Sequence, residues 1–327
     1  MSENKEKIEF THSERKRRSQ FFVIWARFRK NPIAVTGLVI IICMFIFAAL
    51  ADVIAPGTDM HPGYDMQDWA NSFQPPSREN IFGTDHTGRD IFGRIAHGAR
   101  ITLMVGFIVV SVSMTLGVTL GSVAGFYGGY IDNIIMRVVD IIIAMPTIVL
   151  AIAISAALPF DGLYNVMIAV GVGAIPGYAR ITRGQVLTIR EQEFIEAARS
   201  IGASDVRLIR RHVLPNAMAP IIVEATMGMA GAIASAAALS FLGLGISPPT
   251  PEWGAMLSDG RRFMLAGYWW MTIFPGAAIA MIIFSLNMMG DGLRDALDPK
   301  LRSAGFSKKK FKRMLKAKQQ LGGGVLP

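Results

Sequence analysis

Residues 101–131 read ITLMVGFIVVSVSMTLGVTLGSVAGFYGGYI, and these 31 residues contain no Lys, Arg, Asp or Glu. An α-helix needs about 20 apolar residues, each rising 1.5 Å, to cross roughly 30 Å of hydrocarbon. Five further uncharged stretches of 18 to 28 residues lie on either side of this one. The sequence therefore predicts an all-α polytopic membrane protein with six transmembrane helices. Charged residues make up only 17% of the chain, which excludes a soluble enzyme for most of it.

The uncharged stretches and their flanking residues define a membrane domain over residues 31–302. We expect the six spans at about 32–54, 101–124, 138–157, 163–180, 215–246 and 268–290. Pro146 is expected to kink the third span. The glycines at 106, 117, 121 and 125 should let the second span contact a neighbouring helix closely.

The distribution of positive charge predicts the topology. Of the 33 Lys and Arg residues, 26 lie in the N-terminal segment 1–30, the segment 180–212 and the C-terminal segment 291–327, against 5 in the loops 55–99 and 246–270. By the positive-inside rule, both termini and the loop 181–215 are cytosolic, and the protein is a multi-pass protein of the cell membrane. The basic net charge of +9 is thus explained by topology, and no nucleic-acid partner is expected. Because the first span is long and preceded by some 30 polar and basic residues, we expect it to stay uncleaved.

Both ends of the chain leave two interpretations open. Residues 1–18 are charged and are expected to be disordered. Phe21, Trp25 and Phe28 then follow helical spacing beside basic residues, which fits either a helix on the inner membrane face or a cytosolic extension of the first span. The basic tail 303–327 fits a solvated extension, or a segment that binds anionic lipid.

The loop 181–215 contains a short amphipathic pattern. Phe194, Ala197, Ala198 and Ile201 would share one helical face. Gly202 is a natural helix end, and Ser204 with the following acidic residue is a helix start. Two short helices joined by a glycine are therefore expected on the cytosolic side. An ordinary capped loop accounts for these observations equally well.

Four sequence blocks resemble a known family. Glu196-Ala197-Ala198, Gly202 and the closing His212-Val213-Leu214-Pro215 resemble the EAA loop of the membrane subunits of binding-protein-dependent ABC importers. The dipeptide, oligopeptide and nickel branch is indicated by the blocks FGTDHTGRD (82–90), LSFLGLG (239–245) with PPTPEWG (248–254), and GDGLRDALDP (290–299). Their joint order is similar to the C-type permease of that branch, whose fold is that of a type I ABC importer.

The resemblance implies partners and roles. Such a permease forms a heterodimer with a related B-type permease, binds two cytosolic ATPase subunits, and receives its substrate from an extracytoplasmic binding protein. Contact with the ATPases is expected at Glu196, Ala197, Ala198, Gly202, Arg211, His212, Leu214 and Pro215. Asp85, Gly88, Arg89 and Asp90 are candidates for an external gate or a binding-protein contact. A di- or oligopeptide is the expected solute, with nickel or a metal chelate as the alternative.

No catalytic motif accompanies these blocks. The sequence lacks a Gly-Lys dipeptide and therefore a P-loop, so we expect no enzyme activity and no cofactor bound by this chain, with ATP and Mg²⁺ used by the partner ATPases. A metal site at Asp85, His86 and Asp90 is less expected than turn formation or helix capping.

Ionisable residues inside spans are the remaining candidates. Glu224 lies well inside a span and is a pathway candidate, or forms a structural hydrogen bond with the partner permease. Arg137 and Asp140 are expected to pair with each other. A secondary transporter acting alone is the rival interpretation, although it would be expected to have more intramembrane carboxylates.

Overall fold

The computed structural model describes residues 20–57, 62–160, 162–246 and 248–297. The predictions for the disordered segment 1–18 and for the basic tail 303–327 lie outside these residues. Within the described residues the chain is helical, with no β-strand beyond an isolated bridge between Thr84 and Asp90. Five helices are long and apolar enough to cross a membrane, or six if a bent pair counts as one span.

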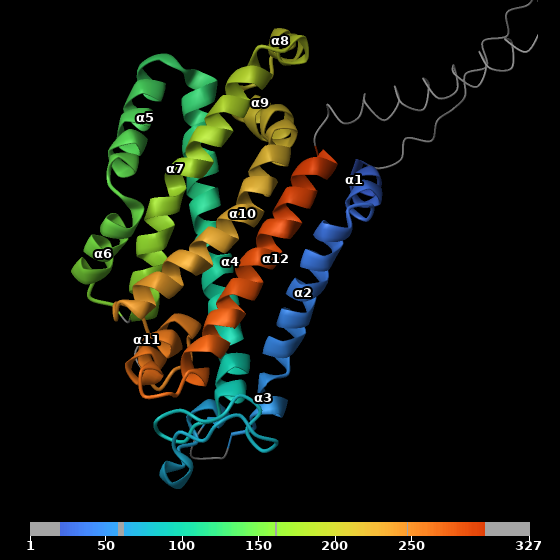
Figure 1. Ribbon diagram of the computed structural model, residues 1–327. Helices are drawn as coiled ribbons and strands as arrows, with labels where there is room; N and C mark the ends of the chain where they lie inside the picture. The colour runs from blue at the N-terminus through green and yellow to red at the C-terminus, as the bar shows by residue number, and fades with distance from the viewer. Residues whose placement is uncertain (1–19, 58–61, 161, 247, 298–327) are drawn as a thin grey trace, which may run out of the picture.

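Twelve α-helices are found in the described residues (Figure 1). They are α1 (Gln20–Phe28), α2 (Pro32–Ala49), α3 (Ala51–Ile54), α4 (Ile91–Tyr127), α5 (Gly129–Ala144), α6 (Thr147–Ala157), α7 (Gly162–Arg190), α8 (Glu193–Ser200), α9 (Asp205–Leu208), α10 (Leu214–Phe241), α11 (Trp253–Met264) and α12 (Trp270–Leu297).

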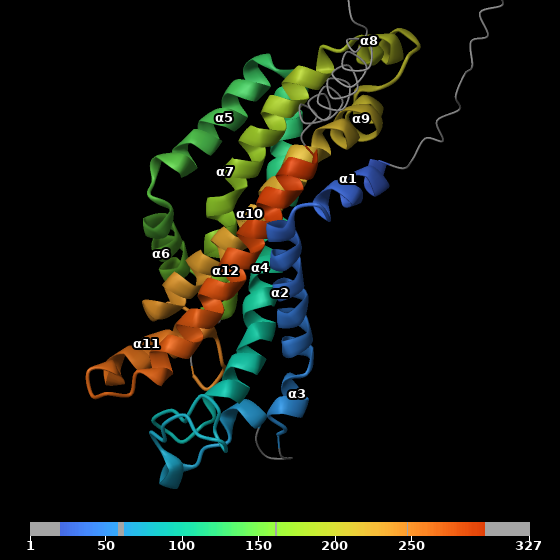
Figure 2. The same cartoon turned by 45° about the vertical axis from the view of Figure 1, so that its right-hand side comes forward.

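The first long helix, α2, begins where Asn31 accepts hydrogen bonds from the N–H groups of Ile33 and Ala34. Pro32 occupies the first turn, where its missing N–H costs nothing. The helix α1 is separated from α2 by this cap and runs at a steep angle to it (Figure 2), packing the buried Phe28 beside α12. A turn at residues 29–31 thus separates α1 from α2.

The helix α4 is the longest element and packs along α7. It begins at Ile91 rather than at the expected residue 101, because Asp90 caps it by accepting a hydrogen bond from Gly93 N–H at 2.7 Å. A Cβ at Gly117 or Gly121 would meet the backbone of α7, and one at Gly125 would meet the carbonyl of Arg183 at 2.9 Å. The predicted close contact through these glycines is confirmed, and a larger residue at these positions would collide with α7.

The third expected span is broken into two helices. α5 ends at Ala144, α6 begins after Pro146, and the two are bent by 94°. The kink predicted at Pro146 is confirmed, but it is a complete break because proline removes a backbone donor and restricts the preceding residue. The helical part also starts at Gly129, before the expected residue 138. In Figure 1 this pair lies at one side of the bundle.

The last three long helices differ from the expected spans at their ends: α7 and α12 extend further, and α10 ends earlier. α7 extends to Arg190 rather than 180, and α12 reaches Leu297 rather than 290. α10 ends at Phe241, not at 246, because Gly243 turns the chain with φ +86°. The loop expected between the fifth and sixth spans contains a further helix, α11.

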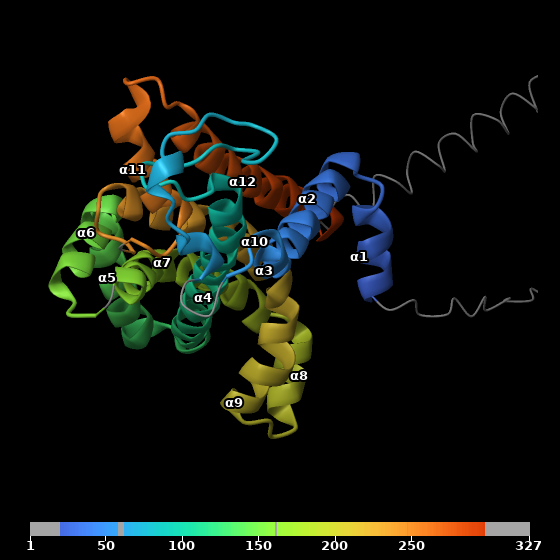
Figure 3. The ribbon, with the colours of Figure 1, turned by 90° about the horizontal axis from the view of Figure 1, so that it is seen from below.

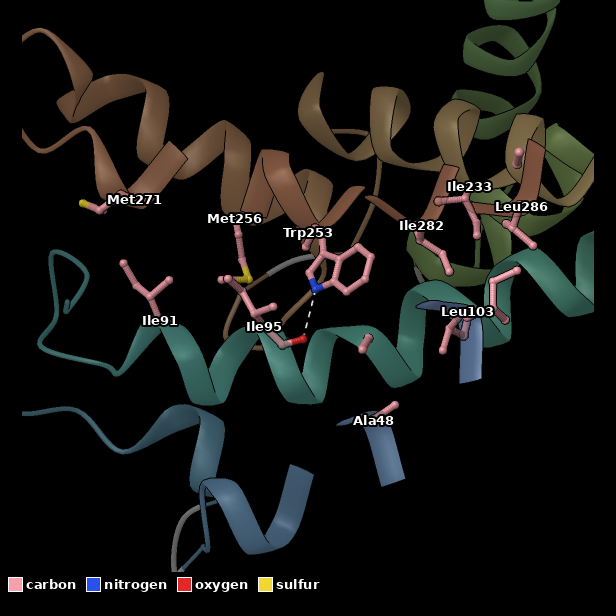
Figure 4. Packing of buried hydrophobic residues seen from close by; sticks show 14 of the residues in the cluster. Ala48, Ile91, Ile95, Leu103, Ile233, Trp253, Met256, Met271, Ile282 and Leu286 are labelled. Atoms are coloured by element: carbon pink, nitrogen blue, oxygen red, sulfur yellow. Dashed lines mark hydrogen bonds between the residues drawn. The ribbon is translucent and has the colours of Figure 1, made fainter. Parts of the chain in front are cut away.

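A buried cluster fixes α11 against the bundle (Figure 4). Trp253, at its first residue, is fully buried and donates its indole N–H to the Ile95 carbonyl at 3.1 Å. A Cβ added at Gly98 would lie only 2.9 Å from the Trp253 ring, so a side chain at this position would collide with the indole. Ile233 and Ile282 complete the cluster, so α4, α10, α11 and α12 share one core.

Candidate functional site

The segment 191–215, called here the protruding loop, projects from one end of the bundle (Figures 1 and 3). It consists of α8, α9 and a π-helical turn, Ile209–Val213, that leads into α10. The two helices predicted around a glycine are therefore present. Their position beyond the long helices leaves their outward surface accessible at that end.

A Schellman motif joins α8 to α9. Gly202 N–H donates to the Arg199 carbonyl at 2.9 Å, and Ala203 N–H donates to the Ala198 carbonyl at 3.1 Å. Gly202 has φ +86°, the left-handed conformation that glycine adopts without a Cβ penalty. A Cβ at Gly202 would meet nothing within 4 Å, so only backbone conformation restricts this position.

The protruding loop has a buried face and an exposed apolar face. Ile195 and Leu208 are buried, against Phe126 and Val186 of the bundle. Phe194, Ile201 and Val206 are exposed by 42%, 87% and 60% of their surface. The face predicted to be apolar thus points outward, while Ile195, which the pattern did not place on that face, anchors the loop.

The other residues expected to contact the ATPases lie in the same loop. Glu196 and Ala197 on α8 and Arg211 on the π-helical turn are exposed, and Ala198 is half-buried. The His212 carbonyl accepts a hydrogen bond from the Asn216 side chain at 2.6 Å. Leu214 and Pro215 form the first turn of α10, where proline is tolerated.

At the opposite end, residues 62–90 and α11 form what we call the distal cap. Asp85 is its centre: Oδ1 accepts from Thr87 N–H and hydroxyl, both at 2.8 Å, and Oδ2 accepts from Arg89 Nε at 2.7 Å. Arg89 also reaches Asp65 at 3.4 Å, and Arg94 Nε lies 3.9 Å from Asp85. Asp85, Arg89 and Arg94 are all buried.

The electrostatics of Asp85 follow from this network. Burial raises the pKa of its carboxyl, but the charges of Arg89 and Arg94 and the hydrogen bonds from Arg89 and Thr87 outweigh burial, so the pKa lies below its usual value. Asp85 and Arg89 were predicted as gate or binding-protein contacts. Their side chains are enclosed in the distal cap in this chain, where they fix its shape.

Gly88 and Asp90 have separate structural tasks. Gly88 has φ +80°, and a Cβ there would collide with the Asp68 backbone. Asp90 caps α4, and burial raises the pKa of its carboxyl although the N–H groups of Gly93 and Phe92 counteract this. Turn formation at Asp85 and capping at Asp90 are confirmed, and no group able to hold a metal is found in the described residues.

Two residues beside the distal cap, Arg94 on α4 and Glu252 just before α11, were not predicted as site residues. Arg94 donates to the carbonyls of Tyr64 (3.0 Å) and Pro249 (3.2 Å), which ties three segments together. Glu252 caps α11 by accepting from the N–H groups of Gly254 and Ala255 at 3.0 and 2.9 Å. The signal for Glu252 was its position just before an amphipathic run, although Glu is an uncommon capping residue.

Charged pairs also link α5 to α7. Asp140 pairs with Arg180 at 2.6 Å, and not with Arg137 as expected, so that prediction is wrong. Asp132 accepts two hydrogen bonds at 2.5 Å from the Arg183 guanidinium. Each carboxylate therefore pairs with an arginine on another helix, 40 or 51 residues away in the sequence.

The pathway candidate Glu224 lies on α10, half-buried and facing α7. Its Oε1 is 3.6 Å from the point where a Cβ at Gly177 would lie. Among the described residues no hydrogen bond or ion pair involves Glu224.

Two family models match the sequence. The model described as the binding-protein-dependent transport system inner membrane component matches residues 117–303. The model of the N-terminal TM domain of oligopeptide transport permease C matches residues 19–76. Together the two models cover most of the described helices.

Curated relatives and a solved structure agree with these matches. The chain is 47% identical over 275 residues to the dipeptide transport system permease protein DppC of Alkalihalophilus pseudofirmus, covering 84% of this chain and 88% of that protein. It is 44% identical over 288 residues to the glutathione transport system permease protein GsiD of Escherichia coli, covering 87% and 92%. An inward-facing structure of the MetNI methionine ABC transporter covers 62% of this chain and 96% of its own, with a TM-score of 0.51 and 21% identity. This last likeness shows the fold alone.

Proposed function

Because the chain belongs to the family of binding-protein-dependent transport system inner membrane components, we propose that it imports peptides as the C-type permease of an ABC importer. It forms half of the translocation pathway beside a related B-type permease. The names of the dipeptide and glutathione relatives support a peptide solute over nickel or a metal chelate. An extracytoplasmic binding protein delivers the substrate to the distal cap.

In this proposal the chain carries no catalytic group and no cofactor of its own. Two cytosolic ATPase subunits bind ATP and Mg²⁺ and dock on the protruding loop. The observation that carries this assignment is the exposed apolar surface of Phe194, Ile201 and Val206, held rigidly by the Gly202 turn. Exposed apolar side chains clustered on one surface indicate a protein interface. Closure of the ATPases would move this loop, and α10 directly behind it, as one body.

The distal cap and Glu224 take roles that follow from their positions. The buried network of Asp85 and Arg89, the turn at Gly88 and the cap at Asp90 hold the surface on which the binding protein or an external gate acts. Glu224, with no partner among the described residues, is proposed to face the pathway.

Because the partner ATPases supply the energy in this proposal, transport should require them and should persist when the proton gradient is collapsed while ATP is supplied.

A pair of glycine variants tests the docking role. Gly202 and Gly243 both have φ +86° and both lie in Schellman turns. A Cβ added at either position would meet no neighbouring side chain or backbone within 4 Å. Valine at either position therefore carries the same backbone strain, of order 1 kcal/mol or more. We expect Gly202→Val to reduce ATPase association at least tenfold and to abolish uptake, and Gly243→Val to leave association intact.

The measurement is co-purification of the ATPases with the permease pair, together with ATP-driven dipeptide uptake in proteoliposomes. Glu196→Lys, which reverses an exposed charge on α8, should repeat the effect of Gly202→Val without backbone strain. Wild-type association in both Gly202→Val and Glu196→Lys would rule out the protruding loop as the docking element.

A further inference from the structure

A groove of about 570 Å³ lies between the distal halves of α2 and α12. Its α2 wall runs from Ile40 to Phe47, and its α12 wall runs from Phe274 to Met281. Each wall covers two helical turns, about 10 Å. The buried Ile95 of α4 lines the groove between the two walls, because α4 packs beside both helices (Figure 2).

The inner end of the groove is closed by direct contact between α2 and α12. A Cβ at Gly37 would lie 2.6 Å from the Ser285 carbonyl oxygen, so the two backbones approach closely there. Gly37 comes one turn before the start of the α2 wall, and Ser285 comes one turn after the end of the α12 wall. Further out, the α12 wall presents the small residues Ala277 and Ala278, which leave the space between the helices unfilled.

A chain of four aromatic rings closes the distal end. Phe47 of α2 contacts Phe92 of α4, with ring centroids 5.4 Å apart. Phe92 contacts Phe82 of the distal cap at 5.0 Å, and Phe82 stacks on Phe274 of α12 at 4.1 Å. The rings thus join both walls through α4 and the distal cap, and the groove is blind at both ends.

The groove opens sideways onto the apolar surface of the bundle. Cys43 and Ala277, one on each wall, are exposed. Around the opening, Phe45 of α2 and Phe284 of α12 are exposed by 51% and 66%. The helix α2 contains no charged residue and lies at the edge of the bundle (Figure 2). A helix that is apolar all round and exposed at such an edge faces lipid, so the groove is continuous with the lipid-facing surface.

The shape of the groove selects an alkyl chain over a partner helix. A transmembrane helix is about 10–12 Å wide with its side chains and crosses roughly 30 Å, so it does not enter a blind groove about 10 Å long. A single flexible chain enters from the side. Among the described residues no charged side chain lines the groove, which therefore offers nothing to a polar ligand.

The depth of the groove places it in one leaflet. Trp269 is 47% exposed and contacts Phe274 at the distal end, with ring centroids 5.9 Å apart. Exposed Trp residues gather where a membrane meets water. The groove therefore lies in the leaflet beside the distal cap, which the predicted topology makes the outer leaflet.

We propose that this groove binds one acyl chain of an outer-leaflet phospholipid. The chain fills the space that Ala277 and Ala278 leave, and it joins α2 to α4 and α12 where no side chain does. This inference concerns a lipid site and does not depend on which solute is imported.

The test is photo-crosslinking with phosphatidylethanolamine that carries a diazirine in the middle of one acyl chain. The permease pair with its ATPases is equilibrated with this lipid and washed in mild detergent to remove freely exchanging lipid. After irradiation, mass spectrometry locates the crosslinks, which we expect on segments 40–47 and 274–281.

Groove-filling variants separate this site from general lipid contact. Ala277→Phe should lower the crosslink yield about tenfold, because displacing even two methylene groups weakens binding by roughly that factor. Ala280→Phe is the matched control, since Ala280 is exposed on the same helix and does not line the groove, and it should leave the yield unchanged.

A second pair repeats the test from the opposite wall, so the result does not depend on the folding of one variant. Cys43→Phe should act as Ala277→Phe does, and Ile42→Phe, at an exposed position outside the groove, should not. Co-purification of the partner permease shows that each variant assembles. Equal crosslink yields in the wild type and both groove-filling variants would overturn the site. The absence of crosslinks from both segments in the wild-type complex would also overturn it, and would indicate that the partner permease covers the groove.

Discussion

Two aspartates five residues apart in the distal cap are both shielded, yet they have opposite electrostatic situations. Asp85 is surrounded by Arg89, Arg94 and Thr87, which lower its pKa despite burial. Asp90 has backbone N–H groups but no cation, and burial raises its pKa. The same side chain therefore stabilises the cap as an ion at one position and pays a desolvation cost at the other.

We expect Asp85→Asn to destabilise the protein by about 3 kcal/mol, because it leaves two buried guanidinium groups short of a counter-charge. This corresponds to a fall in apparent Tm on the order of 5–10 °C. Asp90→Asn should change Tm by roughly 2 °C or less, since Asn caps helices as well as Asp does. Thermal unfolding of the permease pair in nanodiscs measures both.

The pH dependence separates the two sites further. Because the pKa of Asp85 is depressed, its contribution is present above the unfolded value of about 3.9 and is lost as pH falls through the folded pKa. The folded-state pKa of Asp90 is raised, so burying its charged form destabilises the protein at neutral pH, and this cost is relieved as the carboxyl is protonated. The wild type should therefore gain stability relative to Asp90→Asn as pH falls from neutral towards the folded-state pKa of Asp90. Parallel pH profiles of wild type and Asp90→Asn would contradict this assignment.

At the scale of elements, α5 is held to the bundle differently from the other long helices. Only Val139 of α5 is buried, and its contacts with α7 include the pairs Asp132 with Arg183 and Asp140 with Arg180. The break at Pro146 also separates α5 from α6. Ion pairs to α7 therefore contribute to the attachment of α5 beside the packing of Val139.

A double-mutant cycle measures this attachment. Asp132→Asn and Arg183→Gln should each lower the free energy of unfolding, and the double variant should lose about 1 kcal/mol less than the sum. The pair is partly exposed, which keeps the expected coupling small. Strict additivity, by the same unfolding measurement in nanodiscs, would show that α5 is held by other contacts.

These elements show what could be predicted from the sequence and what could not. The turn at Gly202 and the kink at Pro146 were predictable because each depends on the backbone preferences of one residue. The pairing of Asp140 was predicted wrongly because its partner, Arg180, comes from another helix. The burial of Trp253 was not predicted either, since an apolar residue in a loop gives no sign of which core it joins.

At the scale of the whole molecule, the two functional ends are held by different kinds of contact. The distal cap is fixed by buried charges and by Trp253, whereas the protruding loop is anchored by apolar contacts of Ile195 and Leu208. The long helices between them expose large apolar side chains such as Phe107 and Phe284, by 65% and 66%. Such surface suits lipid or a partner permease, and it places the two ends on opposite sides of a membrane.

The orientation of these ends follows from charge. The 26 Lys and Arg residues on the side of the protruding loop, against 5 on the other, predict by the positive-inside rule that this loop lies in the cytosol. Ser77 in the distal cap and Ser204 in the protruding loop are both exposed, so cysteines there differ in side and not in accessibility. In a Cys43→Ala background, an impermeant maleimide applied to intact cells should label Ser77→Cys and leave Ser204→Cys unlabelled. Permeabilised cells should label both to the same extent, which confirms that the second thiol is reactive. Labelling of Ser204→Cys from outside would invert the topology, and the protruding loop could then no longer meet a cytosolic ATPase.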